Sequence, residues 1–181
     1  TAFHSRFYDP YICEDGRLVP HAESLDDCWS DSGVNALSVL DRLYPVDRLR
    51  LSCPRQSRQK KNQPGTLSIS VVFQFPVLDL DTAGFGLIDT AWDQGRNYKA
   101  TTLFFGQSGW WIQADHTAQT VTISGPRGKA AEMVRFDGER LLNHYLSLFA
   151  DYRNRVRYGS EMNSAVARRV HGQFFAGSNA S

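Results

Sequence analysis

The sequence has few cysteines, and this shortage excludes whole classes of protein. Its 181 residues contain only Cys13, Cys28 and Cys53, and none of them has the CxxC spacing of a zinc site. Because three thiols cannot all pair with one another, the sequence predicts a reducing compartment, either cytoplasmic or nuclear. No motif calls for a metal or another cofactor, so none is expected.

Net charge and long apolar runs are missing as well. Twenty basic and nineteen acidic side chains leave a formal net charge of +1. A chain so close to neutral lacks the basic surface that binds nucleic acid or an anionic membrane. No stretch approaches the roughly 18 apolar residues of a membrane helix, and no basic-then-apolar leader follows Thr1. We therefore expect neither nucleic acid nor a membrane as a partner.

The chain does have enough apolar sequence for a folded core, since 41% of its residues are hydrophobic and 22% are charged. Residues 49–65 differ from the rest because they hold two prolines, a basic run and no apolar period after Leu51. We predict an exposed linker there. It would separate an N-terminal unit of residues 1–48 from a main domain of residues 66–181.

The N-terminal unit is expected to contain a hairpin and a helix. Turn signals at Asp9-Pro10 and Asp15-Gly16 separate segments rich in aromatic residues, which indicates a hairpin. A helix is then expected to begin at Ser24, its cap, and to end before Pro45. This unit is interpreted either as a degenerate first repeat of the main domain or as an extension packed against it.

The main domain shows the alternation of an antiparallel sheet, followed by a helical period. Strands are predicted at Thr66–Phe75, from Gly84 toward Trp92, and at Thr101–Phe105, Gly109–Gln113, Thr120–Ser124 and Ala131–Phe136. One helical face follows between Asp137 and Gly159, with core positions at Leu141, Tyr145, Leu148, Phe149 and Tyr152. The sequence thus predicts an α+β fold in which an antiparallel six-stranded sheet is crossed by a C-terminal helix.

Part of this stretch resembles a known family. The run QADHTAQTVTISGP, followed by a last strand and a helix ending in RNRVRYGSEM, resembles the second repeat of a polo-box domain. That domain is the targeting module of polo-type serine/threonine kinases, and the resemblance covers about residues 84–162. It implies a non-catalytic module that binds a protein or phosphoprotein partner and so localises a kinase or scaffold to centrosomes, basal bodies or kinetochores. Divergent polo boxes dimerise, so a homodimer is implied too.

The resemblance singles out His116. In the family, a histidine at this DHT step and a lysine two residues later hold the phosphate of a phosphopeptide. Here Ala118 occupies the position of that lysine. The resemblance therefore implies binding that does not depend on phosphate, although Lys99 and Lys129 are basic residues that could approach His116 from neighbouring turns.

The adjacent residues Trp110 and Trp111 are the other candidates for partner binding. Successive side chains of a strand point to opposite faces of the sheet, so one tryptophan is expected in the core and the other on the outside. Filling the core is the usual role of a tryptophan in a small sheet. An outward-facing tryptophan would be an anchor for a partner protein.

Two other function classes stay open. Cys28-Trp29 near the start of a helix, with His116 as a base, is the pattern of a cysteine peptidase. No upstream oxyanion donor accompanies it, and burial of both residues on an amphipathic helix explains the pair more simply. The second alternative is an unrelated viral or bacterial interaction protein with a β-meander. The order of the strands distinguishes these interpretations.

Overall fold

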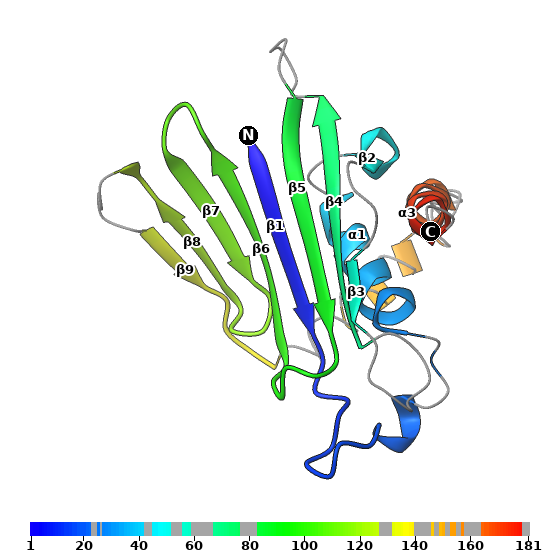
Figure 1. Ribbon diagram of the computed structural model, residues 1–181. Coiled ribbons are helices and arrows are strands. Elements are labelled where there is room, and N and C mark those ends of the chain that lie inside the picture. Colours follow the sequence, from blue (N-terminus) through cyan, green and yellow to red (C-terminus); the bar gives the residue numbers. More distant parts are fainter. Residues whose placement is uncertain are drawn as a thin grey trace.

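A computed structural model of the chain describes residues 1–22, 25, 27–41, 45–51, 56–58, 67–76, 83–126, 132–139, 146, 149–150, 153–154, 157 and 164–178. Its main feature is one large β-sheet, with helical segments gathered beside β4 (Figure 1). In the part of the chain that is described, no helix is long and apolar enough to cross a membrane.

The sheet is mixed, and nine strands form it among the described residues. They are β1 (Ala2–Tyr8), β2 (Arg50–Leu51), β3 (Gln56–Arg58), β4 (Ser68–Pro76), β5 (Ala83–Ala91), β6 (Tyr98–Phe105), β7 (Trp110–Asp115), β8 (Thr120–Ser124) and β9 (Glu132–Arg135). Their order is β2-β4-β5-β1-β6-β7-β8-β9, and β3 also pairs with β4. β1 and β5 are parallel, whereas the other described pairings are antiparallel.

The first strand of the chain lies in the middle of this sheet. Ser5 of β1 is opposite Ile88 of β5 on one side and Thr101 of β6 on the other. A parallel neighbour cannot be reached by a tight turn, because parallel strands need a long crossover connection. After β1 the chain accordingly forms helical segments, re-enters the sheet through β2 to β4, and only then places β5 beside β1 (Figure 1).

The helical segments are η1 (Pro20–Ala22), the π-helical turn η2 (Trp29–Gly33) with its continuation α1 (Val34–Leu40), η3 (Val46–Arg48) and α3 (Ser164–Ser178). Of these, η2 and α1 pack on one face of the sheet, against β1 and β5. The core beneath them combines helical Trp29, Leu37 and Leu40 with strand residues such as Phe7 and Val71, all buried. We call this side of the sheet the covered face.

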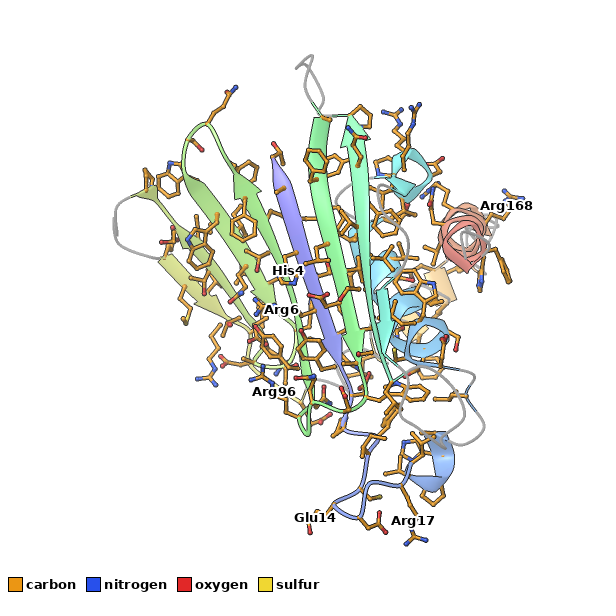
Figure 2. All side chains as sticks on the ribbon, in the orientation of Figure 1. His4, Arg6, Glu14, Arg17, Arg96 and Arg168 are labelled. Carbon is orange, nitrogen blue, oxygen red and sulfur yellow. The ribbon has the colours of Figure 1, made fainter. Side chains whose placement is uncertain are left out.

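Strand alternation assigns the remaining side chains to the other side, which we call the open face. In β4 the burial alternates, so that Ile69 and Val71 are buried while Ser70 and Val72 between them are partly exposed. In β1 the same alternation places Phe3 on the covered face and both His4 and Arg6 on the open face. None of the described helices lies over His4 or Arg6 (Figure 2).

The C-terminal helix α3 packs against α1 and η3. Arg169 donates two hydrogen bonds to the carboxylate of Asp41, from Nε at 2.9 Å and from Nη2 at 2.6 Å. Gln173 Nε2 donates to the carbonyl oxygen of Leu49 at 3.1 Å, and Val170 is buried between these contacts. This helix therefore closes the helical layer.

The predicted antiparallel six-stranded sheet is wrong. The strand periods at residues 66–75, 101–105 and 120–124 correspond to β4, β6 and β8, but β1 enters the middle of the sheet and makes it mixed. The expected N-terminal hairpin is present but short: a bridge joins Ile12 and Leu18, and two backbone hydrogen bonds across the hairpin flank it. Most of the helix expected at residues 137–159 lies outside the described residues, and Phe149, expected in its core, is 65% exposed. The division at residues 49–65 stays a prediction.

Two glycines of β5 make room for a pair of aromatic rings. Phe3 and Phe75 stack with their ring centroids 5.6 Å apart. A Cβ atom built at Gly86 would lie 2.0 Å from ring carbons of Phe3, and one at Gly84 would lie 2.5 Å from the ring of Phe75. The rings thus occupy the volume that β5 side chains would otherwise take.

Gly86→Ala is expected to lower the free energy of unfolding by about 1–3 kcal/mol, because Phe3 has to leave its position in a packed core. Gly172→Ala is the matched control, since Gly172 lies in α3 with open space around it. This control should gain about 0.5–1 kcal/mol from helix propensity. Urea unfolding measures both, and equal stability of the two variants would contradict the packing described here.

Candidate functional site

Charged and polar groups gather on the covered face, where β1 ends and β6 begins. Lys99 Nζ lies 2.9 Å from Asp9 Oδ1, and Ser32 Oγ donates a hydrogen bond of 2.8 Å to Asp9 Oδ2. Only 6% of the Asp9 side chain and 23% of the Lys99 side chain are exposed. With Tyr11 and Asp31 these residues form what we call the Asp9–Asp31 cluster.

The backbone after β1 positions the first half of this cluster. The amide of Asp9 donates to the carbonyl oxygen of Ala91 at 2.9 Å, which extends the β1–β5 ladder by one residue. The amide of Tyr11 then donates to the carbonyl oxygen of Trp92 at 3.2 Å. Asp9 is consequently held on the sheet rather than on a free loop.

The π-helical turn η2 supplies the second half. The Asp27 carboxylate accepts hydrogen bonds from the amides of Trp29 and Ser30, at 2.9 and 2.8 Å, and so starts the turn. A Cβ atom at Gly33 would lie 2.4 Å from the ring of Trp29, so the tight packing of that ring requires glycine. Wide turns of this kind are rare and frequently occur at functional sites.

The surroundings of the cluster raise the pKa of one carboxyl, that of Asp31. Burial raises the pKa of Asp31, the nearby carboxylate of Asp9 raises it further, and Lys99 only partly opposes them. Burial, together with Asp31 and Asp9, also raises the pKa of Tyr11 to about 12.

The Lys99–Asp9 ion pair joins β1 to β6, and this structural role is enough to explain it. Asp31 is different, because a half-buried carboxyl beside another carboxyl destabilises the fold without making an ion pair in return. Carboxyls with raised pKa values are the groups that exchange protons with substrates near neutral pH. Asp31 is therefore the candidate acid–base group, and Tyr11 and Lys99 are its neighbours.

His116 and Lys99, which the sequence suggested as binding residues, do lie together. The amide of His116 donates to the carbonyl oxygen of Lys99 at 2.7 Å, while the Lys99 ammonium pairs with Asp9. The His116 ring lies against Phe7, with centroids 5.8 Å apart, and its Nε2 is 3.4 Å from Thr101 Oγ1. Burial lowers the pKa of His116, against the opposing effect of Asp115. Their role in partner binding stays a prediction.

The other predicted site residues are spread over the molecule. Trp110 is opposite Phe105 and Trp111 is opposite Phe104 in the β6–β7 register, so the two tryptophans point to opposite faces. Trp110 is 41% exposed, while Trp111 is half-buried. Lys129 lies outside the described residues.

Cys28, the nucleophile of the peptidase alternative, is a packed thiol. Its side chain is fully buried, and Thr90 Oγ1 lies 3.4 Å from its sulfur. Burial in such surroundings suits a structural cysteine and not an accessible nucleophile. Among the described residues no group of three metal-ligating side chains could hold a metal ion.

Sequence reasoning missed Asp9, Asp31 and Ser32. Asp31 and Ser32 belong to the acidic segment around Cys28, but that segment reads as an ordinary helix start. Their proximity to Asp9 arises only because β1 pairs beside β5, and β5 contacts η2. The sequence signal for this site was the repeated aspartate in LDDCWSDSG. It did not show which residues these aspartates would contact.

No family model matches the sequence, and no curated protein does either. The fold, however, is similar to solved oxidoreductases. UDP-N-acetylglucosamine 3-dehydrogenase GnnA from Acidithiobacillus ferrooxidans matches with a TM-score of 0.72 at 12% identity, over 97% of this chain and 51% of that one. An inositol dehydrogenase homolog from Azotobacter vinelandii, complexed with NAD+, matches with a TM-score of 0.53 at 12% identity, over 74% and 36%.

An oxidoreductase from Pseudomonas syringae matches at a TM-score of 0.52 and 12% identity, over 74% of this chain and 33% of that one. The chain thus spans about half the length of the first structure and about a third of the other two. These likenesses establish the fold.

The polo-box assignment is wrong, and with it the non-catalytic targeting module for kinetochores or centrosomes. The neighbours are oxidoreductases, and the match to GnnA covers nearly the whole chain, whereas the polo-box resemblance covered residues 84–162. Short strands joined by turns occur in many antiparallel sheets. The residues around His116 therefore match such a sheet without being specific to one family. The central β1 excludes a simple meander.

The described residues do not fit a nicotinamide dinucleotide. Such a site needs a strand, a glycine-rich turn and a helix whose N-terminus faces the pyrophosphate. Gly84 and Gly86 have the start of that spacing, but they lie inside β5 beneath the rings of Phe3 and Phe75. In the described part of the chain, β1 and β5 are the one parallel pair, and no glycine-rich turn leads from either strand into a helix.

Asp31→Asn is expected to raise the melting temperature at neutral pH but not at acidic pH. The folded chain binds the Asp31 proton more tightly than the unfolded chain does, because its pKa is raised from 3.8. Wild-type stability therefore falls as the pH rises from about the ordinary aspartate pKa through the raised one, and a neutral amide lacks this fall.

The measurement is the melting temperature against pH for the wild type, Asp31→Asn and Asp137→Asn. Asp137 is exposed and serves as the control, so its variant should follow the wild type. If Asp31→Asn also runs parallel to the wild type at every pH, the pKa of Asp31 is not raised.

Proposed function

We propose that this chain forms the substrate-binding half of an oxidoreductase that acts on a hydroxyl group of a sugar or cyclic polyol. The observation that carries the proposal is the match of 97% of the chain to half of a UDP-N-acetylglucosamine 3-dehydrogenase. A second neighbour is a homolog of inositol dehydrogenase, bound to NAD+. Both names describe dehydrogenation of a ring that carries several hydroxyl groups.

The nicotinamide cofactor of this proposal is held outside the described residues, because these do not form a dinucleotide site. Their contribution is to bind and orient the substrate and to move its proton. Oxidation of a hydroxyl group to a carbonyl releases that proton, and a general base has to accept it.

Asp31 is the proposed base. Its pKa is raised by burial and by Asp9, which brings it toward the range in which a carboxyl exchanges protons near neutral pH. Tyr11 lies close enough for the charge of Asp31 to raise its pKa, and its hydroxyl would keep the carboxylate oriented. Lys99 neutralises Asp9, so the cluster can carry one negative charge without a second uncompensated carboxylate beside it.

Ligand-induced stabilisation tests the proposal on the 181-residue chain. UDP-N-acetylglucosamine or myo-inositol at about 100 times its Kd should raise the melting temperature by about 5–10 °C, whereas NAD+ alone should not. Asp31→Ala should remove the shift produced by myo-inositol, and the exposed control Asp137→Ala should keep it.

The proposal fails if neither compound changes the melting temperature at millimolar concentration. It also fails if Asp31→Ala binds myo-inositol as tightly as the wild type does, because the Asp9–Asp31 cluster would then not contact the substrate.

A further inference from the structure

A second cluster lies at the same end of the sheet, on the open face. The guanidinium carbon of Arg6 is 5.4 Å from the centroid of the Tyr98 ring, and that of Arg96 is 5.2 Å from the same centroid. The ring of Tyr8 lies 6.2 Å from that of Tyr98. Figure 2 shows His4, Arg6 and Arg96 one below another along β1, toward the turn between β5 and β6.

The strand register explains why the two arginines meet on one ring. Arg6 is opposite Ala100 in the β1–β6 pair, and Tyr8 is opposite Tyr98. Because the alanine side chain is short, Arg6 can reach diagonally over Tyr98, which lies two residues along the same face. Arg96 comes from the exposed turn that precedes β6 and approaches the same ring.

Asp89, which is opposite Arg6 in the β1–β5 register, balances part of these two positive charges. Asp89 is the carboxylate whose charge acts on Arg6. Its oxygens are already engaged, with His4 Nε2 at 2.6 Å from Oδ2 and Ser70 Oγ donating to Oδ1 at 2.6 Å. Among the described groups, Arg6 Nε is buried and has no hydrogen-bond partner, and neither arginine forms an ion pair.

We propose that Arg6, Arg96 and Tyr98 form a binding site for the diphosphate group of a small molecule. An arginine fork matches the oxygens of a phosphate group, and charge-assisted hydrogen bonds of this kind are the strong ones. Two forks from different segments meet at one ring, so each fork can take one phosphoryl group of a diphosphate. The ring of Tyr98 holds both guanidinium groups in place.

This site goes beyond the proposed function and does not depend on it. Tyr98 and Lys99 are neighbours in β6 and point to opposite faces, so the sheet separates the diphosphate site from the Asp9–Asp31 cluster. A ligand at one site does not touch the residues of the other. The two proposals can therefore fail separately.

Titration calorimetry with inorganic pyrophosphate, and separately with UDP, tests the site on the 181-residue chain. Arg6→Gln and Arg96→Gln should each weaken the Kd by about tenfold or more, as the loss of a charge-assisted contact does. Arg168→Gln is the control, because Arg168 is an exposed arginine of α3 far from this face (Figure 2). It removes the same unit of charge and should leave the Kd unchanged.

The two ligands distinguish the source of the diphosphate. Equal affinity for pyrophosphate and UDP supports a site for free diphosphate, and tighter binding of UDP supports a nucleotide diphosphate. The site is overturned if neither ligand binds at millimolar concentration, or if Arg168→Gln weakens binding as much as the other two variants do.

Two controls complete the design. If Arg6→Gln does not fold, Arg96→Gln decides the result, because Arg96 lies in an exposed turn. Asp31→Ala should bind pyrophosphate as the wild type does while losing its response to myo-inositol, which has no phosphate. A loss of pyrophosphate binding in Asp31→Ala would contradict two separate sites.

Discussion

The insertion of β1 between β5 and β6 is the constraint on which the rest of the structure depends. Seven consecutive residues pair on both sides, in parallel with residues 85–91 and antiparallel with residues 98–104. A slip of one residue would exchange the faces, so Phe3 would leave the core and Arg6 would enter it. Both candidate sites depend on this register, because Asp9 and Arg6 are positioned by the same strand.

The same end of the sheet therefore presents two different chemistries. On the covered face, burial and a neighbouring carboxylate raise the pKa of Asp31. On the open face, two guanidinium groups share one tyrosine ring, and the oxygens of Asp89, the carboxylate opposite Arg6, are already engaged by His4 and Ser70. Strand alternation separates the clusters, since Tyr98 belongs to one and Lys99 to the other. A proton-transfer group and an anion site can thus coexist without cancelling each other's charge.

The sequence was informative where structure is local. The alternation of apolar residues located β4, β6 and β8. Trp110 and Trp111 were expected to point in opposite directions because they are adjacent in one strand. The sequence could not locate the partner of β1, because a parallel pairing across about eighty residues depends on side-chain packing from distant segments. Asp9 and Asp31 were missed for that reason, and the letters around His116 were assigned to the wrong family.

Backbone nuclear Overhauser effects between strands test the central claim most directly. The account predicts contacts from Ser5 to Ile88 in a parallel pattern and from Ser5 to Thr101 in an antiparallel pattern. Direct contacts between β5 and β6, as in an antiparallel meander with no strand between them, would contradict it.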